Sequence, residues 1–113
     1  MKNKILTSPL FDRRYKRFKK KFPSLESEMI DFLKLLDDNP MMGVLISENT
    51  YKVRLASADK NKGRSGGFRV ITYLVKELLN SNFEINLLVI YDKSEESSFD
   101  KSQIKTLIKK LEL

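Results

Sequence analysis

The chain of 113 residues contains no histidine, no cysteine and no tryptophan. Without histidine it has no imidazole to act as a general base, to activate a serine or to bind a metal. Without cysteine it has no thiol nucleophile, no thiolate for a zinc or iron–sulfur site, and no disulfide. Any catalysis must therefore use Lys, Arg, Tyr, Asp, Glu, Ser or Thr.

Long apolar runs are also absent. The longest clean run, Leu87–Tyr91, is far shorter than the roughly 20 residues that a membrane-spanning helix needs. The basic start, Met1–Lys4, precedes only Ile5 and Leu6, which is too short for the core of a signal peptide. We therefore expect a cytoplasmic protein with no membrane partner, and the lack of cysteine agrees with a reducing compartment.

What the chain has is an excess of positive charge. Lys and Arg number 22 against 15 Asp and Glu, which gives a formal net charge of +7. With 41% apolar residues, this composition and length predict one folded domain over residues 1–113.

The excess lies in two segments. Residues 2–21 are strongly basic and contain a single acidic residue, Asp12, whereas residues 24–38 are mostly acidic and residues 52–69 are basic again. We interpret the run Arg13–Lys21 as a solvated helix face, with contact to RNA phosphates as the alternative.

The first part of the chain predicts a strand and two helices. A short strand is expected at Lys4–Thr7, and Ser8-Pro9 is typical of a helix start. Helical spacing then joins four aromatic residues, Phe11, Tyr15, Phe18 and Phe22.

A second helix is expected from Pro23-Ser24 to Asn39-Pro40. Its apolar side comprises Leu25, Met29, Phe32, Leu33 and Leu36. Because the link between the helices is short, we expect them to pack antiparallel, with the acidic second helix against the basic first.

The middle of the chain changes to strand patterns. Tyr51–Leu55 alternates, and Phe68–Val75 and Phe83–Tyr91 are rich in β-branched and aromatic residues. Asn80-Ser81-Asn82 is expected to form the turn between the last two strands, and the glycines of the loop Ala58–Gly67 permit positive φ.

A helix closes the chain. Asp100 and Gln103 resemble a capping box, Phe99 and Ile104 a hydrophobic staple, and the apolar stripe is Ile104, Leu107, Ile108 and Leu111. The predicted order is β-α-α-β-β-β-α. This is an α+β fold, in which an antiparallel sheet packs against the N-terminal helical hairpin.

The strongest candidate site is the basic segment of the predicted hairpin. Alternation places Lys52 and Arg54 on one strand face, and Arg69 shares a face of the next strand with Tyr73. The loop adds Lys60, Lys62 and Arg64. Such a face suits a polyanion, and Tyr51, Tyr73 or Tyr91 offers a ring for an unpaired base. The alternative is an ordinary solvated surface.

Two other patterns have simpler interpretations. The stretch Gly63–Gly67 lacks the Gly-Lys-Ser/Thr ending of a nucleotide-binding loop and precedes a strand, so we interpret it as a hairpin loop. The carboxylates of Asp92, Glu95 and Glu96 are interpreted as a solvated loop and not as a metal or acid–base cluster.

Three stretches together resemble the core of the RelE/ParE toxin superfamily: Tyr51–Leu55, Lys60–Ile71 and Val89–Glu95. The sequence Lys-Gly-Arg-Ser-Gly-Gly-Phe-Arg-Val-Ile is most similar to its HigB-like branch. The resemblance runs from about Phe18 to the C-terminus, and the middle stretch is its most specific part.

The resemblance implies a bacterial toxin that a cognate antitoxin, itself often DNA-binding, neutralises. It also implies an endoribonuclease that enters the ribosomal A site and cuts translated mRNA without a metal or other cofactor. In such enzymes the 2′-hydroxyl attacks the adjacent phosphate, and basic residues orient that phosphate.

Carried over by position, the resemblance assigns Arg54 and Arg69 to the scissile phosphate. It assigns Lys52 to proton transfer or phosphate contact and places Lys93 where the family often keeps a basic residue. Tyr91 is the candidate for a tyrosine role at the end of the last strand.

The chain also departs from the family pattern. The best-known ribonuclease members carry an Arg just after this strand and a Tyr further on, where this chain has Ser94 and Asp100, with Phe99 adjacent. Two alternatives therefore stay open: a gyrase-directed toxin of the same fold without ribonuclease activity, and an RNA-binding module without catalysis.

Overall fold

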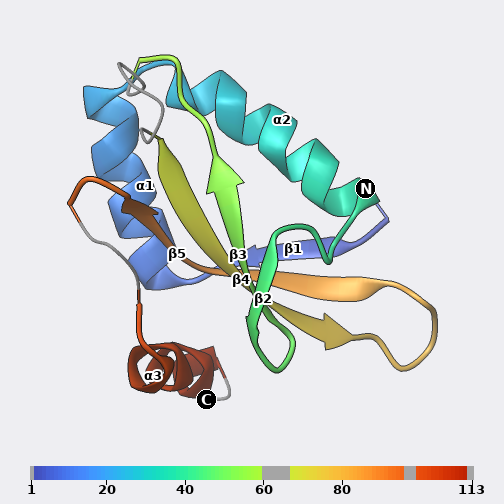
Figure 1. The fold of residues 1–113 in the computed structure, drawn as a ribbon. Coiled ribbons are helices and arrows are strands. Elements are labelled where there is room, and N and C mark those ends of the chain that lie inside the picture. The colour runs from blue at the N-terminus through green and yellow to red at the C-terminus, as the bar shows by residue number, and fades with distance from the viewer. Residues whose placement is uncertain (1, 60–66, 96–98, 112–113) are drawn as a thin grey trace.

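The computed structural model describes residues 2–59, 67–95 and 99–111. Eight elements follow one another along the chain (Figure 1): β1 (Lys4–Thr7), α1 (Pro9–Lys21), α2 (Leu25–Asp38), β2 (Val44–Ser47), β3 (Thr50–Leu55), β4 (Phe68–Lys76), β5 (Phe83–Asp92) and α3 (Lys101–Leu111). The α+β class is confirmed.

The strands form one mixed sheet in the order β1-β5-β4-β3-β2. Strands β2 to β5 pair antiparallel with their neighbours, and β1 pairs parallel with β5. The three sequential strands β3, β4 and β5 pair antiparallel as predicted, but the sheet is mixed and has five strands where the prediction had an antiparallel sheet of four. The parallel edge strand arises because β1 and β5 are joined through the rest of the domain and not by a hairpin.

Strand β2 was not predicted. It has only four residues, and its pairing with β3 shifts register between Leu45 and Ser47. The turn into β3 contains Asn49 at a φ of 56°, a conformation that asparagine adopts more readily than most residues. A strand this short and irregular has no clear alternation, so its pairing partner determines it.

Helices α1 and α2 cover one face of the sheet (Figure 1). At the start of α1 the Oγ of Ser8 accepts a hydrogen bond from the backbone N–H of Phe11 at 3.0 Å and donates one to the carbonyl of Leu88 at 2.6 Å. The two helices diverge from their short connection in Figure 1, so the sheet holds them more than they hold each other. The prediction that the two helices pack antiparallel therefore holds only near their connection.

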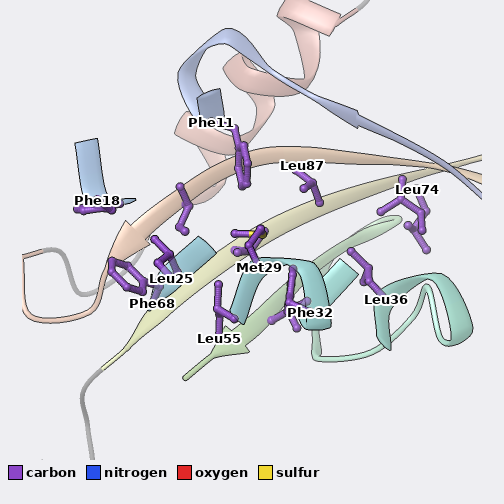
Figure 2. Close-up of a cluster of buried hydrophobic side chains, with 14 residues drawn as sticks. Phe11, Phe18, Leu25, Met29, Phe32, Leu36, Leu55, Phe68, Leu74 and Leu87 are labelled. Atoms are coloured by element: carbon purple, nitrogen blue, oxygen red, sulfur yellow. The ribbon is translucent and has the colours of Figure 1, made fainter. Parts of the chain in front are cut away.

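The main core lies between these helices and the sheet (Figure 2). Phe11 and Phe18 of α1 are buried there, while Tyr15 and Phe22 of the same predicted stripe are partly buried. The ring of Phe18 lies 4.9 Å from that of Phe68 on β4. This contact fixes α1 over the end of the sheet where β4 begins.

Helix α3 lies on the other face. Ile104 packs there in a second cluster with Ile71, Val89 and Tyr91. The predicted capping box is present: Gln103 donates its backbone N–H to Asp100 Oδ1, and Asp100 donates its own to Gln103 Oε1, both at 2.8 Å. The hydrogen bond from the Gln103 N–H, and next the one from the Ser102 hydroxyl, lower the pKa of Asp100. The start of α1 also reaches this side of the sheet, where Leu10 packs in the same cluster as Ile104.

Candidate nucleic-acid interface

Three of the predicted basic residues lie on the sheet face that carries α3. Arg54 of β3 is directly opposite Arg69 of β4, and Lys52 is opposite Ile71, whose side chain packs with α3. Side chains that are directly opposite on antiparallel strands have Cβ atoms roughly 4.5–5.5 Å apart. The register therefore brings the Cβ atoms of the two arginines close together on one face, as the alternation predicted.

This arrangement costs stability. Like charges directly opposite one another destabilise a strand pair. The side chain of Arg54 is exposed, and Arg69 is half-buried, with its Nη1 donating to the carbonyl of Phe68 at 3.2 Å. In the described residues, neither Lys52 nor Arg69 forms a salt bridge with a carboxylate. An anion bound between the cations would offset the repulsion.

The end of β3 is fastened to the start of α2. The backbone N–H of Ala58 donates to Glu28 Oε2 at 2.6 Å, and Ser24 Oγ donates to Glu28 Oε1 at 3.1 Å. In return, the backbone N–H of Ser24 donates to Asp59 Oδ2 at 2.7 Å. Through these contacts α2 holds the segment that follows β3. They therefore fix the end of β3 that carries Arg54.

The start of β4 depends on a glycine. Gly67 has a φ of 95°, and a Cβ at this position would lie 2.8 Å from the carbonyl oxygen of Leu55. Only glycine fits there without strain, which bears out the expectation that a loop glycine uses positive φ. The predicted loop residues Lys60, Lys62 and Arg64 lie outside the described residues.

The structure places Tyr91 differently from the prediction. The register sets it beside Arg69, on the same face, but its side chain is fully buried under Phe99, whose ring centroid lies 5.3 Å away. A ring in this position has no surface to offer to a base or a phosphate. The assignment of Tyr91 as a site residue therefore does not fit this structure, because the ring of Phe99 covers it.

Lys93 remains close to the cluster. Its backbone N–H donates to the carbonyl of Gly67 at 3.5 Å, so it follows β5 at the same strand end as Arg69. Its neighbour Asp92 accepts hydrogen bonds from the N–H and Oγ of Ser94, at 2.8 and 2.7 Å. Within the described ranges no group of His, Cys, Asp and Glu is arranged to hold a metal ion.

Tyr73 lies farther along the same face. It is opposite Asn86 of β5, whose Nδ2 donates to the carbonyl of Tyr73 at 3.2 Å. The tyrosine is half-buried, so part of its ring is accessible. The sequence prediction missed Asn86, because a bulge at Leu88 reverses the alternation of β5 and brings Asn86 and Tyr91 to one face.

The basic side of α1 adjoins this face at the end of β5, where Arg14 lies over the ring of Phe99 at 5.5 Å. Arg17 pairs with Glu95 at 3.8 Å and Lys19 with Glu26 at 4.0 Å, and the side chains of both pairs are well exposed. Exposed pairs of this kind contribute about 0–1 kcal/mol. Four other basic residues of this helix, Arg13, Lys16, Lys20 and Lys21, are exposed, in agreement with the solvated interpretation.

None of the family models compared with the chain matches it, and no curated protein matches it either. No helix in the described part of the chain is long and apolar enough to cross a membrane. The case for a function therefore depends on the cation cluster and on the resemblance of its surrounding sequence.

Proposed function

We propose that the chain binds and cleaves RNA as the toxin of a toxin–antitoxin pair, acting on mRNA in the ribosomal A site. The observation that supports this most is the direct opposition of Arg54 and Arg69, with Lys52 on the same face. The sequence around these residues supplies the link to the RelE/ParE superfamily. The cognate antitoxin and the ribosome are part of the proposal for the same reason.

The geometry suits the charge that develops during phosphate cleavage. In the proposed reaction the 2′-oxygen attacks phosphorus, the bond from phosphorus to the 5′-oxygen breaks, and a 2′,3′-cyclic phosphate and a 5′-hydroxyl result. The guanidinium groups of Arg54 and Arg69 hold the non-bridging oxygens, whose negative charge grows in the transition state.

Proton transfer is assigned to lysine and not to tyrosine. A base has to remove the proton of the 2′-hydroxyl, and an acid has to supply one to the leaving 5′-oxygen. Lys52 shares the face of the arginines, and Lys93 follows the end of β5 beside them. Tyr91 is covered and Tyr73 lies four positions from Arg69 along β4, so Lys52 and Lys93 are the ionisable candidates beside the arginine pair. Positioning by the ribosome would supply much of the remaining rate enhancement.

The burial of Tyr91 favours a second candidate function, which is RNA binding without cleavage. A face of cations can hold a strand while lacking the acid and base that cleavage needs. Mapping of transcript ends after incubation with translating ribosomes separates the two functions. New 5′ ends inside codons support the toxin, and intact transcripts in a stable complex support the binding module.

A further inference from the structure

Away from the cation cluster of Lys52, Arg54 and Arg69, the α3 face of the sheet has a hollow. It has a volume of about 560 Å³ and lies where β1, β5 and β4 run past the end of α3. Figure 1 shows the β4–β5 hairpin extending well beyond that helix. The apolar lining comes from Leu6, Val75 and Leu111, and the polar lining includes Tyr73, Glu84 and Asn86.

The hollow combines a ring with hydrogen-bond acceptors. Tyr73 is half-buried and presents part of its ring, on which a planar base can stack. Asn86 uses its Nδ2 to hold the carbonyl of Tyr73, which leaves its Oδ1 as an acceptor. The carboxylate of Glu84 has no hydrogen bond or salt bridge within the described residues. The polar groups offered to a ligand here are therefore acceptors.

The hollow is aligned with the arginine pair. Arg69 and Tyr73 are on the same strand and the same face, four positions apart, which corresponds to about 13 Å along β4. Lys52 lies between them on the neighbouring strand. Lys4 of β1 is opposite Glu84 of β5 in the strand register. Ile71, between Arg69 and Tyr73 on β4, is buried under α3. An RNA strand held at Arg54 and Arg69 would therefore reach Tyr73 past Lys52 on β3.

We infer that Tyr73, Glu84 and Asn86 form a subsite for an unpaired RNA base that carries an exocyclic amino group. Cytosine, adenine and guanine each present such N–H donors to a carboxylate or amide oxygen. Uracil lacks the amino group, and its one donor, N3–H, lies between two carbonyl oxygens that the acceptors repel. The inference rests on the proposed function, since it assumes that an RNA strand is bound at the cation cluster.

The test measures binding of short single-stranded RNA to the whole protein by fluorescence anisotropy at one salt concentration. Oligocytidylate and oligouridylate of equal length are compared, because the two pyrimidines differ mainly in the amino group. We expect oligocytidylate to bind about tenfold more tightly. Replacing Tyr73 by Leu keeps an apolar side chain but removes the ring, and should weaken oligocytidylate binding by roughly 5- to 150-fold.

A second variant tests the acceptors. Glu84→Gln adds an amide N–H that can donate a hydrogen bond to a uracil carbonyl oxygen. The ratio of the affinities for oligocytidylate and oligouridylate should therefore fall toward one. The matched control is Glu48→Gln, which makes the same charge change at an exposed residue before β3 and should keep the ratio. Circular dichroism shows that each variant is folded.

The outcomes separate this subsite from the proposed function. Equal affinities for both RNAs in the wild type, or an unchanged affinity in Tyr73→Leu, would overturn the subsite while RNA binding at the arginines stands. If neither RNA binds the wild-type protein, the subsite and the RNA-directed function both fail.

Discussion

Arg54 and Arg69 are directly opposite each other on β3 and β4, on the sheet face that also carries Lys52. Nothing in the packing of a small domain requires two guanidinium groups at one cross-strand position, and like charges there reduce stability. Positions that break a local rule in this way are often functional. The pair is therefore the centre of the functional account.

The first prediction concerns the stability cost of this pair. Arg54→Thr removes one of the like charges at an exposed strand position and introduces a residue with high β-propensity. Its effect on the free energy of unfolding should be more favourable by about 0.2–1 kcal/mol when Arg69 is present than in an Arg69→Thr background, because only then does it relieve the repulsion. Thermal melts at low salt measure the difference, which should shrink as salt screens the repulsion. Equal effects in the two backgrounds would show that the arginines do not repel in the folded protein.

The second prediction concerns the dependence of RNA binding on salt. Each phosphate contact on a single strand contributes a slope of about −0.7 to a plot of log affinity against log salt. Arg54→Gln should lower the affinity and make the slope shallower by about 0.7. Arg13→Gln on α1, which is also exposed, is the matched control and should leave the slope unchanged. Equal effects of the two substitutions would mean that binding follows net charge and not the sheet face.

The third prediction concerns pH. Asp37 at the end of α2 accepts hydrogen bonds from the backbone N–H of Asn3 at 2.8 Å and from that of Lys2 at 3.1 Å. These hydrogen bonds, that of Asn3 first, lower the pKa of Asp37 from its ordinary value of 3.8. Its ionised form therefore contributes stability that is complete above pH 3.8 and is lost as the pH falls through the lowered pKa.

Asp37→Asn should remove that acid-dependent part of the stability. Urea unfolding at a series of pH values measures it, and the variant's curve should be flatter than the wild type's in the acid range. Asp38→Asn, at the exposed neighbouring residue, is the control and should keep the wild-type slope. A wild-type slope in Asp37→Asn would show that the contacts with Asn3 and Lys2 do not persist in solution.

The fourth prediction concerns a buried hydroxyl in β4. The side chain of Thr72 is fully buried, and within the described part of the chain its Oγ1 has no hydrogen-bond partner. Thr72→Val keeps the shape and removes the polar atom, so it should raise the free energy of unfolding by about 1–3 kcal/mol. Denaturant titration gives the difference. A destabilised valine variant would mean that the hydroxyl does have a partner in solution.

Much of the fold could be predicted from the sequence, because local sequence patterns mark most of its helices and strands. Lys4–Thr7 has the bounds expected for β1, and the capping box at Asp100 places the start of α3. Lys52, Arg54 and Arg69 could be placed on one face because strands β3 and β4 pair without a shift.

The misses concern strand pairing, which local sequence patterns do not determine. Strand β2 is short and irregular and depends on its hairpin partner β3, whereas the parallel pairing of β1 with β5 joins strands that are distant in sequence. The bulge at Leu88 changes which residues of β5 share a face with Arg69, and Phe99 covers Tyr91 only once α3 is docked. Simple alternation therefore found the cation cluster and misjudged the tyrosine.

The central claim is tested most directly by mapping RNA ends in translating ribosomes treated with the wild-type protein or with Arg69→Ala. We predict cuts within codons for the wild type and a loss of about 10²–10³-fold in cleavage rate for the variant, because a donor to the transition-state charge is removed. Arg13→Ala on α1 serves as the control and should cleave normally. Cleavage by a folded Arg69→Ala protein at the wild-type rate would contradict the account.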